Sequence, residues 1–555
     1  MKRTRGKKGR VEGRTTPWKS LGEIRDLLGD EPRTREYLIE HLHKIQDRYH
    51  HISNRHILSL AIEMELPMAE VYETATFYHH FDVIKSGQTP PPPLTVRVCE
   101  SLTCEMFGAR DLINQLSGNV DKNIARIQPV PCVGRCDKAP VAVVGMNPVE
   151  SASLEHINKV INKKQTEPDV PDCIDYKSYR KNGGYKVLAD CVQGKQDRDK
   201  IISILEDSGL RGLGGAGFPV GRKWKILSEQ PAPKMVAINI DEGEPGTFKD
   251  RYYLEKDPHR FIEGSLIASW AIQDVTAIYI YLRDEYAGCR KMLETELKKL
   301  VDDPPCSIPP IYLRRGAGAY ICGEESAMIE SIEGKKGMPR LRPPYVAQVG
   351  LFGHPTLEQN MESMHWVRDI IENGAEWFTK HGRHDRKGLR SFSVSGRVKK
   401  PGVHLAPAGI TMIELIDEFC GGMLDGHRFY GYFPGGASGG ILPASLGNIP
   451  LDFDTLQEHG CFIGSAAIIV LSDKDSAKAL ALNAMRFFED ESCGQCTPCR
   501  VGTGKAAKLM EKAEWDEQLL EELARAMEDA SICGLGQAAP NPLRCAIKYF
   551  PDEFE

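Results

Sequence analysis

The sequence has no long hydrophobic run. Its longest apolar stretch, from about Cys461 to Leu471, is too short to cross a bilayer. No apolar segment near the N-terminus resembles a secretory signal. A net charge of -6 leaves no excess of positive charge, which argues against a general nucleic-acid binder. These absences predict a cytoplasmic protein whose partners are neither membranes nor nucleic acids.

What the sequence does have is length. Its 555 residues are too many for one hydrophobic core, so we expect several domains. The first 20 residues are basic and are expected to be a flexible, solvated tail, with a docking arm for an acidic partner as the alternative. The predicted segments are the basic tail (1–20), a helical segment (21–89), a small α/β unit (90–150), a polar linker (151–175), a glycine-rich α/β unit (176–388), a strand-rich unit (389–475) and a helical end (476–555).

Hydrophobic periodicity places the first elements within these segments. Pro67 suits the first turn of a helix over 68–77. A run of prolines, Pro90–Pro93, indicates a stiff spacer before the small α/β unit. Apolar runs predict strands over 94–98, 141–144, 235–240, 277–282 and 311–314.

The sequence contains 16 cysteines, and half of them fall into two groups. Grouped cysteines in a reducing compartment usually bind metal or carry redox chemistry. The first group is two pairs, Cys99-x4-Cys104 and Cys132-x3-Cys136. Two thiolate pairs suit a 2Fe–2S cluster, with two thiolates on each iron. A zinc site is the nearest alternative, although zinc pairs more often have the x2 spacing, and four unrelated buried cysteines are a third.

The second group, Cys493-x2-Cys496-x2-Cys499, has a remote fourth candidate in Cys533. Three closely spaced ligands and one distant ligand commonly hold a 4Fe–4S cluster. Zinc is again the alternative. Cys545 lies nearby but is expected to be unligated, like the other cysteines outside the two groups.

A glycine-rich stretch, Arg211–Phe218, contains a formal G-x-G-x-x-G pattern. The pattern follows a helix-like run rather than a strand, so it does not predict an ordinary Rossmann site. A glycine-rich loop still lets a phosphate approach the backbone, and Lys223 lies just beyond it. Further on, a predicted strand ends in the acidic turn Asp241–Glu244. Its carboxylates can accept hydrogen bonds from ribityl or ribose hydroxyls, and a solvated acidic turn is the alternative.

Longer strings carry a family resemblance. Leu66–Tyr78 (LPMAEVYETATFY), with the first cysteine group, resembles the 2Fe–2S subunit of respiratory complex I. From Tyr176 onward the chain resembles the FMN- and NADH-binding subunit, through the glycine loop, the acidic turn and the strings Gly316–Glu325, Arg340–Tyr345 and Gly353–Asn360. The resemblance implies a multidomain α/β and α+β fold. Its parts would be an N-terminal helical segment, a thioredoxin-like 2Fe–2S domain, a flavin-binding α/β domain, a small β-grasp-like (SLBB) domain and a helical 4Fe–4S domain.

The resemblance also implies residue roles. Glu244 is expected to orient the nicotinamide and is the candidate catalytic residue. The residues expected to hold FMN are Gly212, Gly214, Gly215, Lys223, Asn239, Asp241, Glu242, Tyr320, Gly323, Glu324, Glu325, Gln359 and Asn360. Those expected to hold NAD(H) are Gly217, Phe218, Glu244, Arg342 and Tyr345. The expected cluster ligands are Cys99, Cys104, Cys132 and Cys136 for 2Fe–2S, and Cys493, Cys496, Cys499 and Cys533 for 4Fe–4S.

In complex I these two subunits are usually separate chains, whereas here they are fused. Fused chains resemble the β subunit of soluble NAD-dependent formate dehydrogenases and the diaphorase subunit of NAD-linked hydrogenases. All four cysteines of the first group are present and no further cysteine run follows Cys533, which favours the formate dehydrogenase.

We therefore expect hydride exchange between NAD(H) and FMN, and single-electron transfer through both clusters. The expected partner, in a hetero-oligomer, is a formate-oxidising subunit with a molybdenum- or tungsten-pterin centre and further iron–sulfur clusters. The alternatives are the diaphorase of an NAD-linked hydrogenase and, in a different class, a redox-inactive assembly scaffold.

Overall fold

The computed structural model describes residues 18–555. The described residues up to Pro91, with Gly334–Lys336, form one compact unit, and residues 92–333 with 337–555 form a second. The chain therefore passes from the first unit to the second after residue 91. Among the described residues, no helix is both long enough and apolar enough to span a bilayer.

The first unit is helical. Its helices are α1 (Trp18–Leu28), α2 (Leu38–Tyr49), α3 (Asn54–Glu63) and α4 (Met68–Phe77), and its short strands β1 (Ile52–Ser53) and β2 (Val83–Ile84) pair in parallel. The helix predicted over 68–77 is confirmed as α4. Helix α1 begins inside the range assigned to the basic tail, because Leu21, Ile24 and Leu28 give it a buried face. The rest of that tail, residues 1–17, lies outside the described residues.

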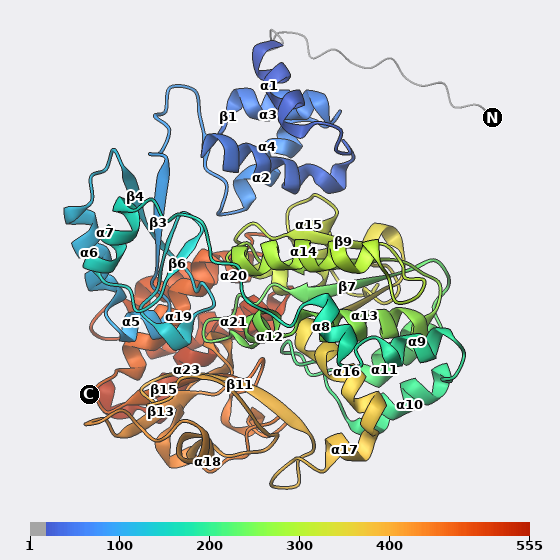
Figure 1. The fold of residues 1–555 in the computed structure, drawn as a ribbon. Coiled ribbons are helices and arrows are strands. Elements are labelled where there is room, and N and C mark those ends of the chain that lie inside the picture. The colour runs from blue at the N-terminus through green and yellow to red at the C-terminus, as the bar shows by residue number, and fades with distance from the viewer. Residues whose placement is uncertain (1–17) are drawn as a thin grey trace. The chain divides into compact units, whose positions relative to one another are not determined.

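The thioredoxin-like domain is a four-stranded sheet in the order β4-β3-β5-β6. Strands β3 (Leu94–Cys99) and β4 (Ala125–Val130) are parallel, while β5 (Ala142–Val144) and β6 (Asn147–Val149) complete an antiparallel edge. Helices α5 (Leu102–Met106) and α6 (Ala109–Asn119) connect β3 to β4 (Figure 1). The strands predicted over 94–98 and 141–144 are confirmed. Cys99 ends β3, and Cys132 follows the end of β4, so both cysteine pairs lie at one edge of this sheet.

The predicted linker contains a helix. Helix α7 (Leu154–Asn162) is capped at its N-terminus by Ser153, whose side chain accepts the backbone N–H of His156. Ile157 and Val160 are buried in the core of the thioredoxin-like domain. The prediction of a polar linker over 151–175 was therefore wrong for these residues, because the polar residues cover only the outer face of an amphipathic helix.

The third domain contains a parallel sheet in the order β10-β7-β8-β9. Its strands are β7 (Lys234–Ile240), β8 (Val275–Leu282), β9 (Ile311–Arg315) and β10 (Thr356–Asn360), and the three predicted ones are confirmed. Helices α13 (Pro258–Ile272) and α16 (Met361–Asn373) pack against each other beside the sheet (Figure 1). The remaining helices are α8 (Tyr176–Lys181), α9 (Lys186–Val192), α10 (Arg198–Ser208), α11 (Val220–Ser228), α12 (Lys249–Lys256), α14 (Ala287–Asp302), α15 (Glu325–Ile332) and α17 (Ala375–Thr379).

The fourth domain is a mixed sheet in the order β12-β11-β15-β13-β14. Its strands are β11 (Leu389–Gly396), β12 (Gly402–Pro407), β13 (Phe429–Phe433), β14 (Leu442–Pro443) and β15 (Ala467–Ser472). Strand β15 is buried along its whole length, which explains why the longest apolar run of the sequence lies there.

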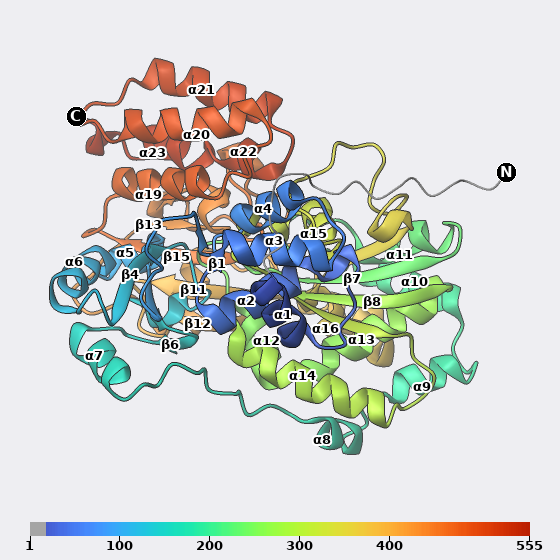
Figure 2. The same cartoon turned by 90° about the horizontal axis from the view of Figure 1, so that it is seen from above.

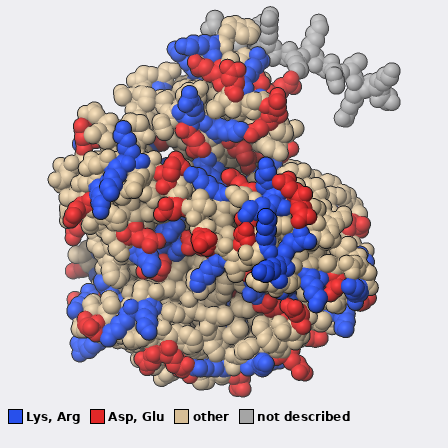
Figure 3. Space-filling view, in the orientation of Figure 1, with Lys and Arg blue, Asp and Glu red and all other residues tan. Residues whose placement is uncertain are grey.

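The chain ends in packed helices. They are α19 (Ala477–Asp490), α20 (Thr497–Met510), α21 (Glu517–Ala530), α22 (Gly534–Ala538) and α23 (Asn541–Tyr549). Helix α19 packs against both α20 and α23, and α20 packs against α21 (Figure 2). On the face of the molecule seen in Figure 3, side chains of both charge signs are interspersed.

Candidate functional site

The site is centred on the carboxyl ends of β7 and β10, which are adjacent parallel strands. The chain runs from β7 outward to β8 and β9 on one side, and returns to β10 on the other. Open parallel sheets bind ligands at such a reversal of strand order. Asn239 of β7 and Asn360 of β10 are register partners there, so two predicted FMN residues lie side by side.

The turn after β7 is built on Asn239. Its side-chain amide donates to the Gly323 carbonyl at 2.9 Å, and its side-chain oxygen accepts the Asp241 N–H at 3.0 Å. The Oδ2 atom of Asp241 is buried without a hydrogen-bond partner, and burial raises the pKa of this carboxyl well above its ordinary value. A buried acceptor without a partner is costly, so Asp241 is suited to accept hydrogen bonds from a polyhydroxylated ligand.

Glu242 has a different environment from its neighbour. Its carboxylate accepts the N–H groups of Asp250 and Arg251 at 2.8 and 3.1 Å and the Tyr286 hydroxyl at 2.8 Å. It therefore caps the first turn of α12. Burial, the first cause, raises the pKa of Glu242 to about 7, and the nearby Asp250 adds to the effect. Glu242 is a predicted FMN residue, but both of its carboxylate oxygens already accept hydrogen bonds from other groups of the protein.

Glu244 and Tyr320 meet at the other end of the turn. One oxygen of Glu244 accepts the N–H and the hydroxyl of Ser438 at 2.8 and 2.9 Å, and the other accepts the Tyr320 hydroxyl. Burial raises the pKa of Glu244. The Tyr320 N–H donates to Glu491 at 2.8 Å, and its ring centroid lies 5.0 Å from that of Phe487 on α19. Tyr320 thus connects the acidic turn to the C-terminal helices.

Lys223 is the centre of a charged cluster beside the strand ends. Its ammonium lies 3.3 Å from Glu358 of β10 and 3.5 Å from Glu325. Burial opposes the charge of Lys223, but the two carboxylates outweigh burial and raise its pKa. Arg342 pairs with Glu325 at 3.2 Å and also with Glu324. The structure thus brings three predicted FMN residues next to a predicted NAD residue.

Glu324 also caps a helix. Its carboxylate accepts the N–H groups of Ser326 and Ala327 at 3.0 and 2.9 Å at the start of α15. Two other predicted residues, Phe218 and Tyr345, are large aromatics that remain 43% and 54% exposed. Exposed rings of this kind suit stacking on a planar ligand.

The glycine loop closes on itself. Gly212 N–H donates to the Phe218 carbonyl at 2.8 Å, and Gly217 N–H donates to the Gly212 carbonyl at 3.2 Å. The loop follows α10 and leads into α11, which confirms that it is not the strand-to-helix turn of a Rossmann fold. A Cβ atom added at Gly214 would lie 2.9 Å from the Cβ of Asn360. Only glycine lets the loop approach the end of β10 this closely.

Sequence reasoning missed the buried charges beneath the site. The ammonium of Lys249 lies 2.9 Å from Asp250 and 3.1 Å from Glu362, and all three side chains are almost completely buried. Asp250 accepts the side-chain amide of Asn360 at 2.8 Å. The neighbouring Gln359 is buried with its amide nitrogen unpartnered. The sequence signal that could have revealed this network was Lys249-Asp250, a few residues after the acidic turn.

The first cysteine group converges. Cys132 and Cys136 have their sulfurs 3.3 Å apart, and Cys99 is within hydrogen-bonding reach of both Cys104 and Cys132. All four are buried. The Gly134 N–H points to the Cys132 sulfur at 3.4 Å, as expected for a backbone donor near a sulfur ligand.

The second group also converges. Its four cysteines, Cys493, Cys496, Cys499 and Cys533, line one small cavity together with Ile321, Pro339 and Leu535. Within residues 18–555, no three His, Cys, Asp or Glu side chains are arranged as the ligands of a single ion. An iron–sulfur cluster places its thiolates around several atoms, so it does not require that arrangement. Cys545 does not line this cavity and instead faces Cys461, with the two sulfurs 3.5 Å apart.

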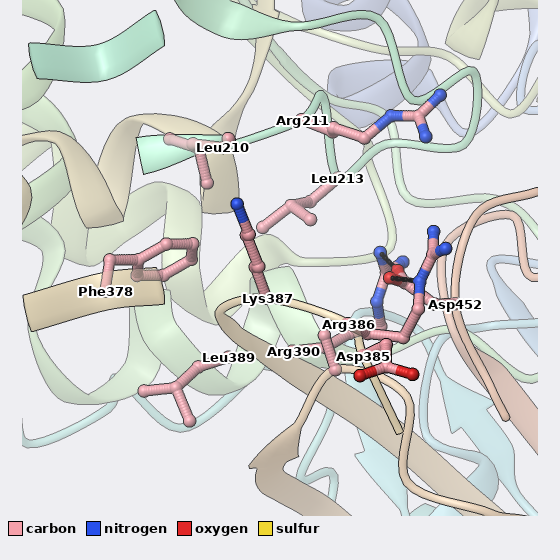
Figure 4. Close-up of a pocket in the computed structure, with 12 residues that line it drawn as sticks. Leu210, Arg211, Leu213, Phe378, Asp385, Arg386, Lys387, Leu389, Arg390 and Asp452 are labelled. Atoms are coloured by element: carbon pink, nitrogen blue, oxygen red, sulfur yellow. Dashed lines mark hydrogen bonds and ion pairs between the residues drawn. The ribbon is translucent and has the colours of Figure 1, made fainter. Parts of the chain in front are cut away.

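A separate cavity of about 250 Å³ lies behind the glycine loop (Figure 4). It is lined by Leu210 and Leu213, by charged residues that directly precede β11, and by Arg390 and Asp452 of the strand-rich domain. Arg386 and Arg390 both pair with Asp452, at 2.8 and 2.7 Å. None of the residues predicted to bind FMN or NAD lines this cavity.

Four segments of the chain match models of known protein families. Residues 205–369 match the Nuo51 FMN-binding domain, and residues 479–555 match the NADH-ubiquinone oxidoreductase-F iron-sulfur binding region. Residues 24–165 match the thioredoxin-like [2Fe-2S] ferredoxin family, and residues 391–442 match the SLBB domain.

Individual relatives resemble different shares of the chain. The F 2 subunit of NADH-quinone oxidoreductase from Rhizobium meliloti is 39% identical over 401 residues, covering 70% of this chain and 95% of the relative. The mitochondrial NADH dehydrogenase [ubiquinone] flavoprotein 1 of Dictyostelium discoideum is 41% identical over 377 residues, covering 64% and 78%. A chain of NAD+-reducing [NiFe]-hydrogenase in the H2-reduced state superposes with a TM-score of 0.82 at 32% identity, over 94% of this chain and 93% of that one.

The residues present fit the groups that these families imply. The unpartnered Asp241 and Gln359 atoms, the close approach at Gly214 and the exposed rings suit a flavin and a dinucleotide. The two convergent thiol sets suit two clusters. The fold and site define an NADH-oxidising, FMN- and iron–sulfur-dependent oxidoreductase subunit. The chain belongs to the family of the FMN-binding (F) subunits of NADH-quinone oxidoreductase, with a thioredoxin-like 2Fe–2S domain fused in front.

Proposed function

We propose that this chain is the diaphorase subunit of an NAD-linked hydrogenase-type complex. In that role it exchanges electrons with a metal-containing partner subunit. The observation that carries the proposal is the extent of the hydrogenase likeness, which spans 94% of the chain and so includes the fusion. The match to the Rhizobium meliloti relative covers only 70% of the chain. The hydrogenase likeness makes the alternative, rather than the formate dehydrogenase expected from the sequence, the preferred proposal.

The family resemblance implies the residue roles, and the geometry of the site supports them. The glycine loop and Lys223 bind the FMN phosphate, because backbone N–H groups and a cation both favour an anion. Asn239, Asp241 and Asn360 hold the ribityl chain of FMN. Phe218 and Tyr345 stack on NAD(H), and Arg342 orients it. Glu244 is held by Ser438 and Tyr320, and it orients the carboxamide of the nicotinamide.

Bound FMN supplies the conversion between two-electron and one-electron chemistry. The protein provides hydrogen bonds that connect the flavin site to the second cysteine group. The Tyr320 hydroxyl donates to Glu244 of the acidic turn, and the Tyr320 backbone N–H donates to Glu491, two residues before Cys493. The acidic turn and the second cysteine group are therefore joined by one hydrogen-bonded path. The carboxylates of the turn disfavour a phosphate on the 2′-hydroxyl of the adenosine ribose, which predicts NAD rather than NADP as the substrate.

The first experiment measures NADH:ferricyanide activity on the purified chain and counts FMN and iron on the same sample. Activity with about one FMN and roughly six irons is expected, from one 2Fe–2S and one 4Fe–4S cluster. If flavin and iron are both absent after anaerobic reconstitution, the proposal fails and the assembly scaffold takes its place. Colour gives an early indication, because a flavin and cluster protein is yellow-brown and a zinc scaffold is colourless.

A second experiment identifies the partner. The tagged chain is purified anaerobically with its bound subunits, and NAD+ reduction is assayed separately with hydrogen and with formate. Hydrogen-dependent reduction with nickel in the complex is expected. Formate-dependent reduction with molybdenum or tungsten would instead restore the formate dehydrogenase.

A further inference from the structure

The Cys132–Cys136 loop is held by a buried arginine of the flavin domain. Arg283 directly follows β8, and its side chain is 5% exposed. Its guanidinium donates to the Cys132 carbonyl at 2.7 Å and to the Glu242 carbonyl. One side chain thus connects the loop of the first cysteine group to the acidic turn of the flavin site.

Close packing fixes the loop against this arginine. A Cβ atom at Gly134 would lie 2.2 Å from the Tyr286 hydroxyl oxygen, so the loop backbone lies directly on that ring. Phe248 packs in one cluster with Cys132 and Cys136. A second arginine, Arg251, donates to the Gly134 carbonyl at 2.9 Å. The position of the loop relative to Arg283 is therefore fixed by close packing and by the hydrogen bond from Arg251.

The charge of Arg283 is paired with the carboxylate of Glu285. Glu285 accepts from the Nε and Nη2 atoms of Arg283 at 3.1 and 2.8 Å. Burial opposes the charged guanidinium, but Glu285 and the neighbouring Tyr286 outweigh burial and raise the pKa of Arg283. Arg251, by comparison, is shared between Glu255 and Asp137.

We infer that the buried charge of Arg283 raises the reduction potential of the 2Fe–2S cluster held by Cys99, Cys104, Cys132 and Cys136. The inference rests on the proposed function, since it requires that cluster. Reduction adds one electron, and one negative charge, to the cluster. A fixed buried cation stabilises that added charge, and a buried anion opposes it, because both act through a medium of low dielectric. Arg283 and Glu285 are thus opposing determinants of one potential.

The test is a dithionite titration of the purified chain, in which the 2Fe–2S signal is followed by electron paramagnetic resonance. R283Q is expected to shift the midpoint potential downward, and R283K to keep it close to the wild-type value. E285Q is expected to shift it upward. R525Q removes the same charge from an arginine of α21 whose side chain is 72% exposed, and should leave the potential unchanged.

Shifts of the midpoint potential in opposite directions in R283Q and E285Q would show an effect of charge. A general loss of packing would not shift the potential in opposite directions in the two variants. Unmoved potentials, or shifts in the same direction, would overturn the inference. If R283Q does not fold, E285Q still decides, because an unchanged potential there contradicts the mechanism. A wild-type protein without any 2Fe–2S signal after reconstitution would instead count against the proposed function itself.

Discussion

The three carboxylates that follow β7 have distinct environments although they are close together in sequence. Asp241 presents an unpartnered oxygen, Glu242 caps α12, and Glu244 is held by Ser438 and Tyr320. Composition identified the turn as unusual, but it could not separate these roles. The separation depends on Asp250, Ser438 and Tyr320, which lie outside the turn, two of them in distant parts of the chain.

Replacing Glu244 tests its orienting role. We expect E244Q to retain FMN but to lower kcat/KM for NADH by about tenfold to a hundredfold, since hydrogen bonds to a charged group contribute about 1.5–3 kcal/mol. NADH:ferricyanide kinetics measure the effect. S438A removes one donor and keeps the carboxylate, so its decrease should be smaller. An E244Q enzyme with wild-type kcat/KM would exclude Glu244 from nicotinamide binding.

The raised pKa of Glu242 predicts that the contribution of this residue to stability depends on pH. Its pKa rises from the ordinary 4.5 to about 7 in the folded protein, mainly through burial. The unfolded chain therefore releases this proton at lower pH than the folded protein, so the contribution of the group to stability is lost as pH rises from about 4.5 through 7. E242Q cannot ionise. Its Tm relative to wild type should therefore increase between about pH 5 and pH 8.

Thermal unfolding curves of E242Q and wild type, recorded at both pH values, measure this difference. The control is E514Q, at an exposed glutamate between α20 and α21, and its Tm should follow that of wild type at both pH values. A constant Tm difference between E242Q and wild type across this range would contradict the raised pKa.

At the scale of elements, the sequence predicted apolar strands, including β7, and missed β10, the other strand whose end forms the site. Strands β3, β7, β8 and β9 were recognisable because most of their side chains are apolar. Strand β10 reads Thr-Leu-Glu-Gln-Asn and lacks that pattern. Its polar residues are buried by the glycine loop and by the charged cluster around Lys223, and these are tertiary partners that periodicity cannot reveal.

The glycine loop was identified from its composition, and its Rossmann interpretation was rejected correctly because of the preceding helix. The sequence could not predict that the glycine loop approaches the end of β10. The contact of Gly214 with Asn360 joins residues that are far apart in the chain. The resemblance alone placed both residues at the flavin, and their roles stay predictions.

A methyl group at Gly214 tests the close approach. We expect G214A to push the loop away from Asn360, since the added Cβ would lie only 2.9 Å from the Asn360 Cβ. FMN content of the purified protein should fall, and added FMN should restore activity only in part. G118A adds a methyl group in α6 with no neighbour within 4 Å, and should bind FMN normally. Full FMN occupancy in G214A would show that the loop does not need this contact.

At the scale of the whole molecule, the two cysteine groups lie in different domains. Each group is connected by hydrogen bonds toward the acidic turn. Arg283 makes the connection to the first group, and Tyr320 makes the connection toward the second. The sequence predicted both groups from spacing alone. It could not predict that both would be connected to one turn, because that arrangement depends on how the domains pack.

Cys533 and Cys545 offer a matched pair of substitutions in the helical end. We expect C533S to lose the 4Fe–4S resonance signal, because one of four ligands is removed from the cavity that the group lines. C545S should retain the signal, since that thiol faces Cys461 instead. Iron analysis and resonance spectra of both variants make the comparison. Loss of the cluster in C545S with retention in C533S would reassign the fourth ligand.

Residues 92–333 and 337–555 form one compact unit, in which Thr103 bonds Ser395 at 2.9 Å and Asn483 bonds the Glu100 carbonyl at 2.9 Å. Where two such domains are separate polypeptides, their pairing depends on mass action and weakens on dilution. In a single chain the covalent link sets a high effective concentration of one domain at the other. The stoichiometry of flavin site to first cysteine group is therefore fixed at synthesis, and dilution cannot separate them.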